Sequence, residues 1–185
     1  MIVAAKKPLS ITFDPQKPPT VSTFQQLSEK ILTAPQLRHT ADRWRTDHQR
    51  IVFTNGCFDL LHYGHLHYLA AAADLGDKLV IGLNSADSVR RLKGPTRPIN
   101  DEPTRQHTLA ALGFVDAVCV FEEDTPLNLI TLLKPDVLVK GGDYRAKEVV
   151  GATELRSWGG EVKILPFVEG YSTTNVEAKI LGKRR

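Results

Sequence analysis

The chain has 185 residues, of which 42% are hydrophobic and 24% are charged, and its formal net charge is +3 at pH 7. This length fits one domain of ordinary size with a flanking extension and can bury a sizeable core. The positive excess lies in the flanks, because residues 51–181 carry 13 basic and 17 acidic side chains. A mildly acidic central region with few, scattered aromatic residues argues against a nucleic-acid-binding surface.

Membrane insertion and secretion are also disfavoured. No apolar run approaches the length that spans a bilayer, and the apolar start of the chain is interrupted at Lys6 before it reaches the length of a signal-peptide core. The two cysteines, Cys57 and Cys119, lie far apart and form no metal-ligand spacing. They suit a reducing compartment, so we expect a cytoplasmic protein without membrane contact.

Two segments precede the first strand. Residues 1–21 contain four prolines among polar neighbours and predict a flexible or wrapping arm. Residues 22–48 contain two apolar runs at helical spacing, separated near Pro35, and predict a helical extension of two short helices.

From residue 51 onward, short apolar strands alternate with helices. The predicted strands are 51–53, 79–83, 117–121, 137–139 and 162–165. The predicted helices are 64–75, 86–92, 103–112, one with Thr125 as N-cap and Pro126 at its first position, 146–157, and one from about Ser172. This order predicts an α/β, Rossmann-like, doubly wound five-stranded parallel sheet over a domain of residues 49–185. Ligands of such sheets bind beyond the carboxyl ends of the strands, where the strand order reverses.

The most informative motif is His62-Tyr63-Gly64-His65, directly after the first predicted strand. The helix that follows puts both histidines at its N-terminus, where unpaired N–H groups and a partial positive charge attract anions. Two imidazoles three residues apart can both donate to phosphate oxygens, and a glycine between them allows a ligand to approach closely. A lone histidine here is usually a cap or a half-buried residue, but the pair predicts a phosphate site. His67 points to another face and is interpreted as structural.

Other phosphate-binding motifs are absent from the sequence. It contains neither the G-x-x-x-x-G-K-[ST] loop nor the G-x-G-x-x-G turn, which argues against a P-loop kinase and a dinucleotide dehydrogenase. A bound triphosphate must then be held by the histidine pair and by scattered basic residues. Lys93, Arg97 and Arg105 are the candidates, with Lys93 ahead of the two arginines, although a Lys or Arg in such a loop is more often a solvated surface charge.

Four motifs taken together resemble the nucleotidylyltransferase superfamily. They are Thr54-Asn55-Gly56-Cys57-Phe58-Asp59 with the histidine pair, Arg91-Leu92-Lys93-Gly94, Val139-Lys140-Gly141-Gly142-Asp143-Tyr144, and Gly170-Tyr171-Ser172-Thr173-Thr174. Over about residues 48–182 the resemblance is closest to the adenylyltransferase domain that makes ADP-heptose from D-glycero-β-D-manno-heptose 1-phosphate. The His-x-Gly-His element alone indicates only nucleotidyl transfer. The four motifs together indicate a far narrower group of enzymes.

The resemblance implies a role for each matching residue. Catalysis would fall to His62, His65 and Lys93. Nucleotide binding would fall to Asn55, Gly56, Cys57, Phe58, Gly64, Arg105, Ser172, Thr173 and Thr174. The acceptor and the ribose would be contacted by Asp59, Lys140, Asp143 and Tyr144. Either aspartate could instead cap a local turn, and Ser172 could be an ordinary N-cap.

The implied reaction uses small molecules only. A sugar 1-phosphate attacks the α-phosphorus of ATP, with Mg²⁺ bound mainly through the ATP phosphates and no metal ligand from the protein. The attacking phosphate has a second pKa of about 6 and needs no general base, so a nucleophilic role for Cys57 is disfavoured.

Two alternatives stay open. Cytidylyltransferases acting on glycerol 3-phosphate or a related phosphorylated alcohol carry Arg-Thr-x-Gly-Ile-Ser-Thr-Thr, whereas Phe167 and Val168 replace the Arg and Thr here, which favours adenine. The other is a non-catalytic nucleotide-binding module. A homodimer is compatible with either.

Overall fold

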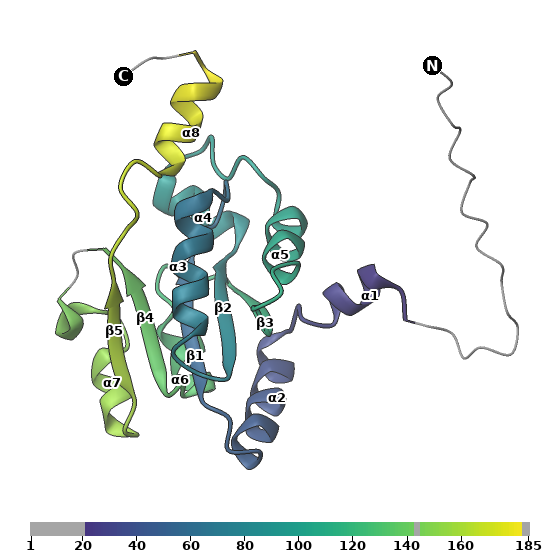
Figure 1. Ribbon diagram of the computed structural model, residues 1–185, viewed down its shortest axis with the longest axis vertical. Coiled ribbons are helices and arrows are strands. Elements are labelled where there is room, and N and C mark those ends of the chain that lie inside the picture. The colour runs from purple at the N-terminus through teal and green to yellow at the C-terminus, as the bar shows by residue number, and fades with distance from the viewer. Residues whose placement is uncertain (1–20, 143–144, 183–185) are drawn as a thin grey trace, which may run out of the picture.

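The computed structural model describes residues 21–142 and 145–182. Its centre is a five-stranded sheet in which every strand pairs in parallel, in the order β3-β2-β1-β4-β5 (Figure 1). The strands are β1 (Ile51–Gly56), β2 (Lys78–Asn84), β3 (Ala117–Phe121), β4 (Val137–Gly141) and β5 (Glu161–Leu165). The predicted Rossmann-like, doubly wound fold is therefore confirmed. The predicted arm, apart from Val21, lies outside the described residues.

Helices connect the strands and precede the sheet. They are α1 (Thr23–Ser28), α2 (Ala34–Thr46), α3 (Tyr63–Ala73), α4 (Ala86–Lys93), α5 (Glu102–Ala110), α6 (Leu127–Leu133), α7 (Ala152–Ser157) and α8 (Thr173–Ile180), with a short 3₁₀ turn η1 (Ala146–Glu148). Both short helices expected ahead of the first strand are present as α1 and α2. Helix α8 projects beyond the carboxyl ends of the strands (Figure 1).

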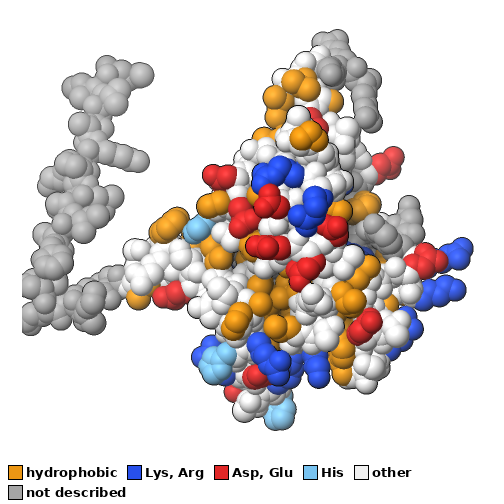
Figure 2. Space-filling view, turned by 180° about the vertical axis from the view of Figure 1, so that it is seen from behind, with side chains coloured by type: hydrophobic (Ala, Val, Ile, Leu, Met, Phe, Trp, Pro, Cys, Tyr) orange, Lys and Arg blue, Asp and Glu red, His pale blue; other side chains and the backbone are white. Residues whose placement is uncertain are grey.

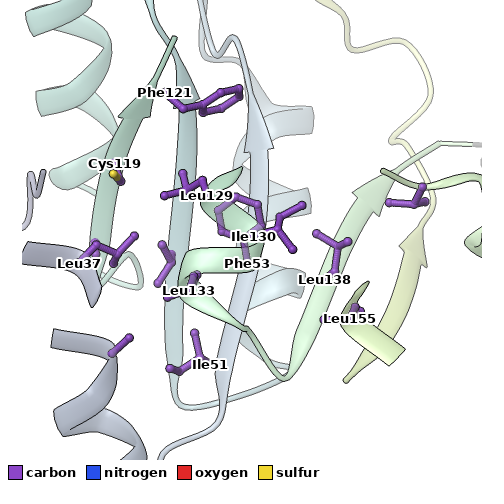
Figure 3. Packing of buried hydrophobic residues seen from close by; sticks show 14 of the residues in the cluster. Leu37, Ile51, Phe53, Cys119, Phe121, Leu129, Ile130, Leu133, Leu138 and Leu155 are labelled. Carbon is purple, nitrogen blue, oxygen red and sulfur yellow. The ribbon is translucent and has the colours of Figure 1, made fainter. Parts of the chain in front are cut away.

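The core has two layers because alternate residues of each strand point to opposite faces of the sheet. Ile51 and Phe53 of β1 pack with α2, α6 and α7, in the cluster drawn in Figure 3. Val52, between them, packs with α3 and α5 on the other face. The sheet is thus covered on both faces, which explains why the sequences of its strands are nearly continuous runs of apolar residues.

The helical extension is part of this core. Leu37 and Ala41 of α2 are fully buried against the sheet. Just before α2, the amide of Leu32 donates to the Val118 carbonyl and the amide of Val118 donates to the Lys30 carbonyl. The extension therefore pairs with β3, which would otherwise be an exposed sheet edge.

The strand order reverses between β1 and β4. The chain first moves outward through β2 and β3, and then returns to place β4 on the other side of β1. The carboxyl ends of β1 and β4 therefore flank the crevice in which this class of sheet binds ligands. Strand β1 also runs three residues beyond the predicted 51–53, because Asn55 pairs with Gly82 and Gly56 with Leu83 of β2.

Two predicted helices are wrong in detail. Residues 146–157 do not form one helix, because Gly151 adopts φ 87° at the start of α7 and separates it from η1. Helix α6 starts at Leu127, with Pro126 at the N-cap position and no side-chain cap. Contacts from α4 hold the preceding turn in another shape: Ser88 donates to the Glu123 carbonyl, and Arg91 pairs with Asp124.

Candidate active site

The two histidines stack at the start of α3, at the carboxyl end of β1. His62 is the N-cap residue of α3 and has extended backbone angles, but its side chain makes no capping hydrogen bond. His65 lies one turn further, and the two imidazole centroids are 3.9 Å apart. Within the described residues, the Nδ1 atom of each ring is buried and has no hydrogen-bond partner. Such buried, unpaired polar atoms are rare in folded proteins and are expected where a ligand supplies the partner.

The environment of the pair favours neutral imidazoles. Burial lowers the pKa of His62, and burial together with repulsion from His62 lowers the pKa of His65 to about 4. Phe58 contributes to this environment, because its ring is nearly buried and meets the His65 ring edge-on at a centroid distance of 5.4 Å. The backbone of Phe58 has φ 42°, an unusual angle for a bulky residue. The turn after β1 is therefore built to place an apolar wall behind His65.

A second helix start lies beside the first. A methyl group built on Gly64 would approach the Cβ atom of Tyr171 to 3.0 Å and the His62 ring to 3.2 Å. A side chain at this position would be crowded by both neighbours, so glycine favours the close approach between α3 and the segment that leads into α8. Ser172, the next residue, is the N-cap of α8 and accepts from the Asn175 amide at 3.1 Å. The Ser172 hydroxyl thus makes the capping contact of an ordinary N-cap, while Thr173 and Thr174 form the first turn.

A half-buried lysine lies at the carboxyl end of β4. The Nζ atom of Lys140 donates to the Oδ1 atom of Asn55, on β1, at 2.6 Å. Burial lowers the pKa of Lys140 to about 8, and no carboxylate forms an ion pair with it in the described part of the chain. A desolvated ammonium group without a counterion is poised to bind an anion.

Lys93 and Cys57 lie close enough to interact electrostatically. Lys93 is exposed in the last turn of α4, and its charge lowers the pKa of the Cys57 thiol. Burial has the larger, opposite effect, and the net result is a raised thiol pKa. Because reactive cysteines have lowered pKa values, the thiol of Cys57 is unsuited to act as a nucleophile.

Asp59 holds the loop between α4 and α5 against the site. Its carboxylate accepts from the amides of Ile99 and Asn100 and from the guanidinium of Arg97, at 2.8–2.9 Å. These contacts lower the pKa of Asp59 in spite of its burial. Arg97 also pairs with Glu177 of α8. Of the two roles open to Asp59 in the sequence, its contacts support fixing a turn.

Arg105 is buried beneath the site. Its Nη1 atom donates to the carbonyls of Cys57 at 2.9 Å and Asn84 at 2.7 Å, which lie just after β1 and at the end of β2. Its side chain is only 1% exposed. We infer that Arg105 fixes these two strand ends, because direct contact with a nucleotide would require the guanidinium to move.

Some site residues were missed or cannot be placed. Asp143 and Tyr144 lie outside the described residues, so their predicted contact with the acceptor stays a prediction. Sequence reasoning missed Glu177 and the contact of Tyr171 with Gly64. No local spacing signals these contacts, because each joins segments far apart in the chain.

The described residues contain no group of three or more His, Cys, Asp or Glu side chains that could hold a metal ion. None of the described helices is both long and apolar enough to cross a bilayer.

A separate groove of about 670 Å³ lies between α2 and α6. It is lined by side chains of both charge signs, and acidic and basic side chains also mix on the back of the molecule (Figure 2). This mixture does not favour a second anion site.

The fold and the histidine pair define a domain of the nucleotidyl-transfer type. A family model described as cytidylyltransferase-like matches residues 53–179, which is more than half of the chain. The chain therefore belongs to the cytidylyltransferase-like family.

Among its relatives, the bifunctional protein HldE of Trichlorobacter lovleyi is 61% identical over 137 residues, which is 74% of this chain and 28% of that relative. The bifunctional protein HldE of Koribacter versatilis is 55% identical over 160 residues, which is 86% of this chain and 33% of that relative. The chain thus spans about a third or less of the length of these curated relatives.

Two solved structures resemble the chain. A lipopolysaccharide core biosynthesis protein from Thermoplasma volcanium is 31% identical with a TM-score of 0.54, covering 67% of this chain and 99% of that one. A pantothenate synthetase from Thermus thermophilus has a TM-score of 0.59 at 17% identity, covering 83% of this chain and 69% of that one. The similarity to the pantothenate synthetase shows only that the two proteins share a fold.

The lowered pKa of His65 predicts a specific loss of stability in acid. Unfolded histidine has a pKa of about 6.5, so between about pH 6.5 and pH 4 the unfolded chain binds a proton that folded His65 does not. Stability therefore falls as the pH falls through this window. We expect His65→Asn to reduce the loss of melting temperature between pH 7 and pH 5 by about 2–4 °C, equivalent to about 1 kcal/mol after allowance for partial exposure.

The control is His39→Asn, which replaces an exposed histidine on α2. Calorimetry of both variants and the parent at a series of pH values measures the effect. If the melting temperature of His65→Asn fell with acid as steeply as that of the parent, the result would contradict the buried environment that lowers the pKa of His65.

Proposed function

We propose that the chain transfers AMP from ATP to a sugar 1-phosphate, D-glycero-β-D-manno-heptose 1-phosphate, giving ADP-heptose and pyrophosphate. The observation that carries the proposal is the pair of stacked imidazoles at the start of α3, beside the start of α8. Their Nδ1 atoms have no hydrogen-bond partner in the part of the chain that the structure describes. The motif resemblance, the HldE relatives and the lipopolysaccharide core biosynthesis protein support the choice of acceptor.

The proposed reaction needs no general base. An oxygen of the sugar phosphate forms a bond to the α-phosphorus of ATP, and the bond from that phosphorus to the bridging oxygen breaks. The electron pair leaves with pyrophosphate. Because the attacking phosphate has a second pKa of about 6, it carries no proton that must be removed at neutral pH. Catalysis then consists of positioning and of stabilising charge on the α-phosphate.

Each anion has an assigned partner in this proposal. The ring N–H groups of His62 and His65 and the first amides of α3 donate to the α-phosphate oxygens. Lys93 and the first turn of α8, with Thr173 and Thr174, hold the remaining phosphates. Lys140 attracts the phosphate of the acceptor, because its desolvated charge has no carboxylate partner among the described residues.

Mg²⁺ fits this site only as part of the substrate. The described residues offer no cluster of metal ligands, and the Asp59 carboxylate is already occupied by three donors. We propose that Mg²⁺ arrives on the ATP phosphates and neutralises part of their charge. A cytoplasmic location and a homodimer stay predictions.

Pyrophosphate release from a panel of substrates tests the proposal. We expect turnover with ATP, Mg²⁺ and the heptose 1-phosphate, and at least about tenfold lower kcat/KM when CTP replaces ATP, which corresponds to about 1.4 kcal/mol of discrimination. Release only with CTP and glycerol 3-phosphate would reject the adenylyl assignment in favour of the cytidylyltransferase. No release with any pair would favour a binding module.

The histidine pair is tested by His65→Ala. Removal of one positioned donor to a developing oxyanion lowers kcat about 100- to 1,000-fold, and we expect a loss of this size. His67→Ala is the matched control on the same helix, because His67 is exposed and faces away from the pair. Melting temperatures are measured in parallel. Equal activity in His65→Ala and His67→Ala would contradict the catalytic role of His65. A loss of activity that only follows a loss of folding would contradict it as well.

Lys140 should show a trade-off between stability and activity. Its charged form is destabilised by burial, so Lys140→Met should raise the melting temperature of the unliganded protein by about 2–4 °C at pH 7. The gain should shrink between pH 8 and pH 10, because folded Lys140 loses its proton near pH 8 and its unfavourable charge with it. Activity should fall at least about tenfold.

Lys147→Met, which replaces an exposed lysine, is the control and should change neither property. A destabilised Lys140→Met protein would contradict the account of a desolvated charge that has no carboxylate partner among the described residues.

A further inference from the structure

Helix α8 is joined to the rest of the domain by few side-chain contacts. None of its residues is buried, and it projects beyond the carboxyl ends of the strands (Figure 1). The hydrogen bonds of Asn175 to Ser172 and Gly170 stay within α8 and the turn before it. In the part of the chain that the structure describes, the ion pair of Glu177 with Arg97 is the one polar side-chain contact that joins the body of α8 to another segment.

Arg97 is itself held in place by a buried carboxylate. Its Nη1 atom donates to the Oδ2 atom of Asp59 at 2.9 Å, and its Nη2 atom pairs with Glu177. The Asp59 carboxylate is fixed in turn by the amides of Ile99 and Asn100. The planar fork of a guanidinium can bridge two carboxylates in this way. The side chains of Arg97 and Glu177 are only 21% and 26% exposed, so salt and water screen their ion pair incompletely.

This bridge connects three segments that the proposed function assigns to the triphosphate. Arg97 follows Lys93 by four residues, and Asp59 precedes His62 by three. Glu177 lies one turn beyond the first turn of α8. A helix without buried residues opens easily, and a binding segment that must first be ordered lowers the affinity for its ligand. A tether that orders α8 beforehand removes that cost.

We propose that Glu177 is a positioning residue that acts through Arg97 to hold the first turn of α8 ready for the phosphates of ATP. The proposal rests on the function proposed above. A carboxylate repels phosphate, so Glu177 acts through the helix and not by contact with the nucleotide. The two effects of its charge have opposite signs. Loss of the tether weakens nucleotide binding, whereas loss of the repulsion alone would strengthen it.

The test is Glu177→Gln, which removes the charge and keeps the size of the side chain. We expect the KM for ATP to rise about fivefold, equivalent to about 1 kcal/mol, the upper value for a partly exposed ion pair. The kcat should change less than about twofold, because the histidines are untouched. The dissociation constant of tripolyphosphate, which carries phosphates without a nucleoside, should rise by a similar factor in calorimetry.

Hydrogen exchange reports on the helix directly. The amides of α8 should exchange faster in Glu177→Gln than in the parent. The melting temperature should stay within about 1 °C of the parent value, because α8 has no buried residue.

Two further variants serve as controls. Glu169→Gln removes the same charge from an exposed position in the segment before α8, and it should change neither the KM for ATP nor the exchange. In an Arg97→Gln background, Glu177→Gln should have no further effect, because the tether is already broken.

A KM for ATP that is unchanged or lowered in Glu177→Gln would overturn the tether, as would unchanged exchange of α8 or an equal rise of the KM in Glu169→Gln. If the parent protein binds tripolyphosphate in a Glu177-dependent manner but releases no pyrophosphate with any substrate pair, the proposed function fails and the tether stands.

Discussion

The site depends on the meeting of two helix starts at the carboxyl end of β1. A parallel sheet brings the amino ends of its following helices to one edge, and helix starts carry unpaired amides and a partial positive charge. Here the contact between Gly64 and Tyr171 brings the start of α3 beside the segment that leads into α8. We propose that this convergence forms an anion site from backbone geometry, to which the side chains of His62 and His65 add hydrogen-bond donors.

Much of the site is arranged at some cost to the folded state. Among the residues that the structure describes, two buried imidazole nitrogens lack hydrogen-bond partners and the desolvated Lys140 has no carboxylate counterion. Phe58 has a left-handed backbone. Each of these features is unfavourable in the free protein. In the proposed reaction, bound ATP would give the imidazole nitrogens a partner, and the phosphate of the acceptor would give Lys140 a counterion. Rigid supports surround them: Arg105 fixes the ends of β1 and β2 from below, and Asp59 holds the loop between α4 and α5. Polar groups held in place before the substrate binds are what charge stabilisation in a phosphoryl-type transfer requires.

Sequence patterns predicted the features that depend on neighbouring residues. The strands follow from apolar runs, and the histidine pair follows from its spacing at a helix start. The patterns did not predict features that depend on distant partners. The salt bridges of Arg97 to Asp59 and Glu177 join three separate segments. The burial of Arg105 depends on carbonyls that only the folded sheet brings together. The break at Gly151 reflects an αL conformation that the helical pattern around it concealed.

The central claim is that the stacked imidazoles bind the α-phosphate of ATP. A crystal structure of the protein with a non-hydrolysable ATP analogue tests it most directly. The account predicts ring nitrogens of His62 and His65 within about 3 Å of α-phosphate oxygens, the distance of a charge-assisted hydrogen bond. A nucleotide bound elsewhere, with both rings still packed against each other and their Nδ1 atoms unpaired, would contradict it.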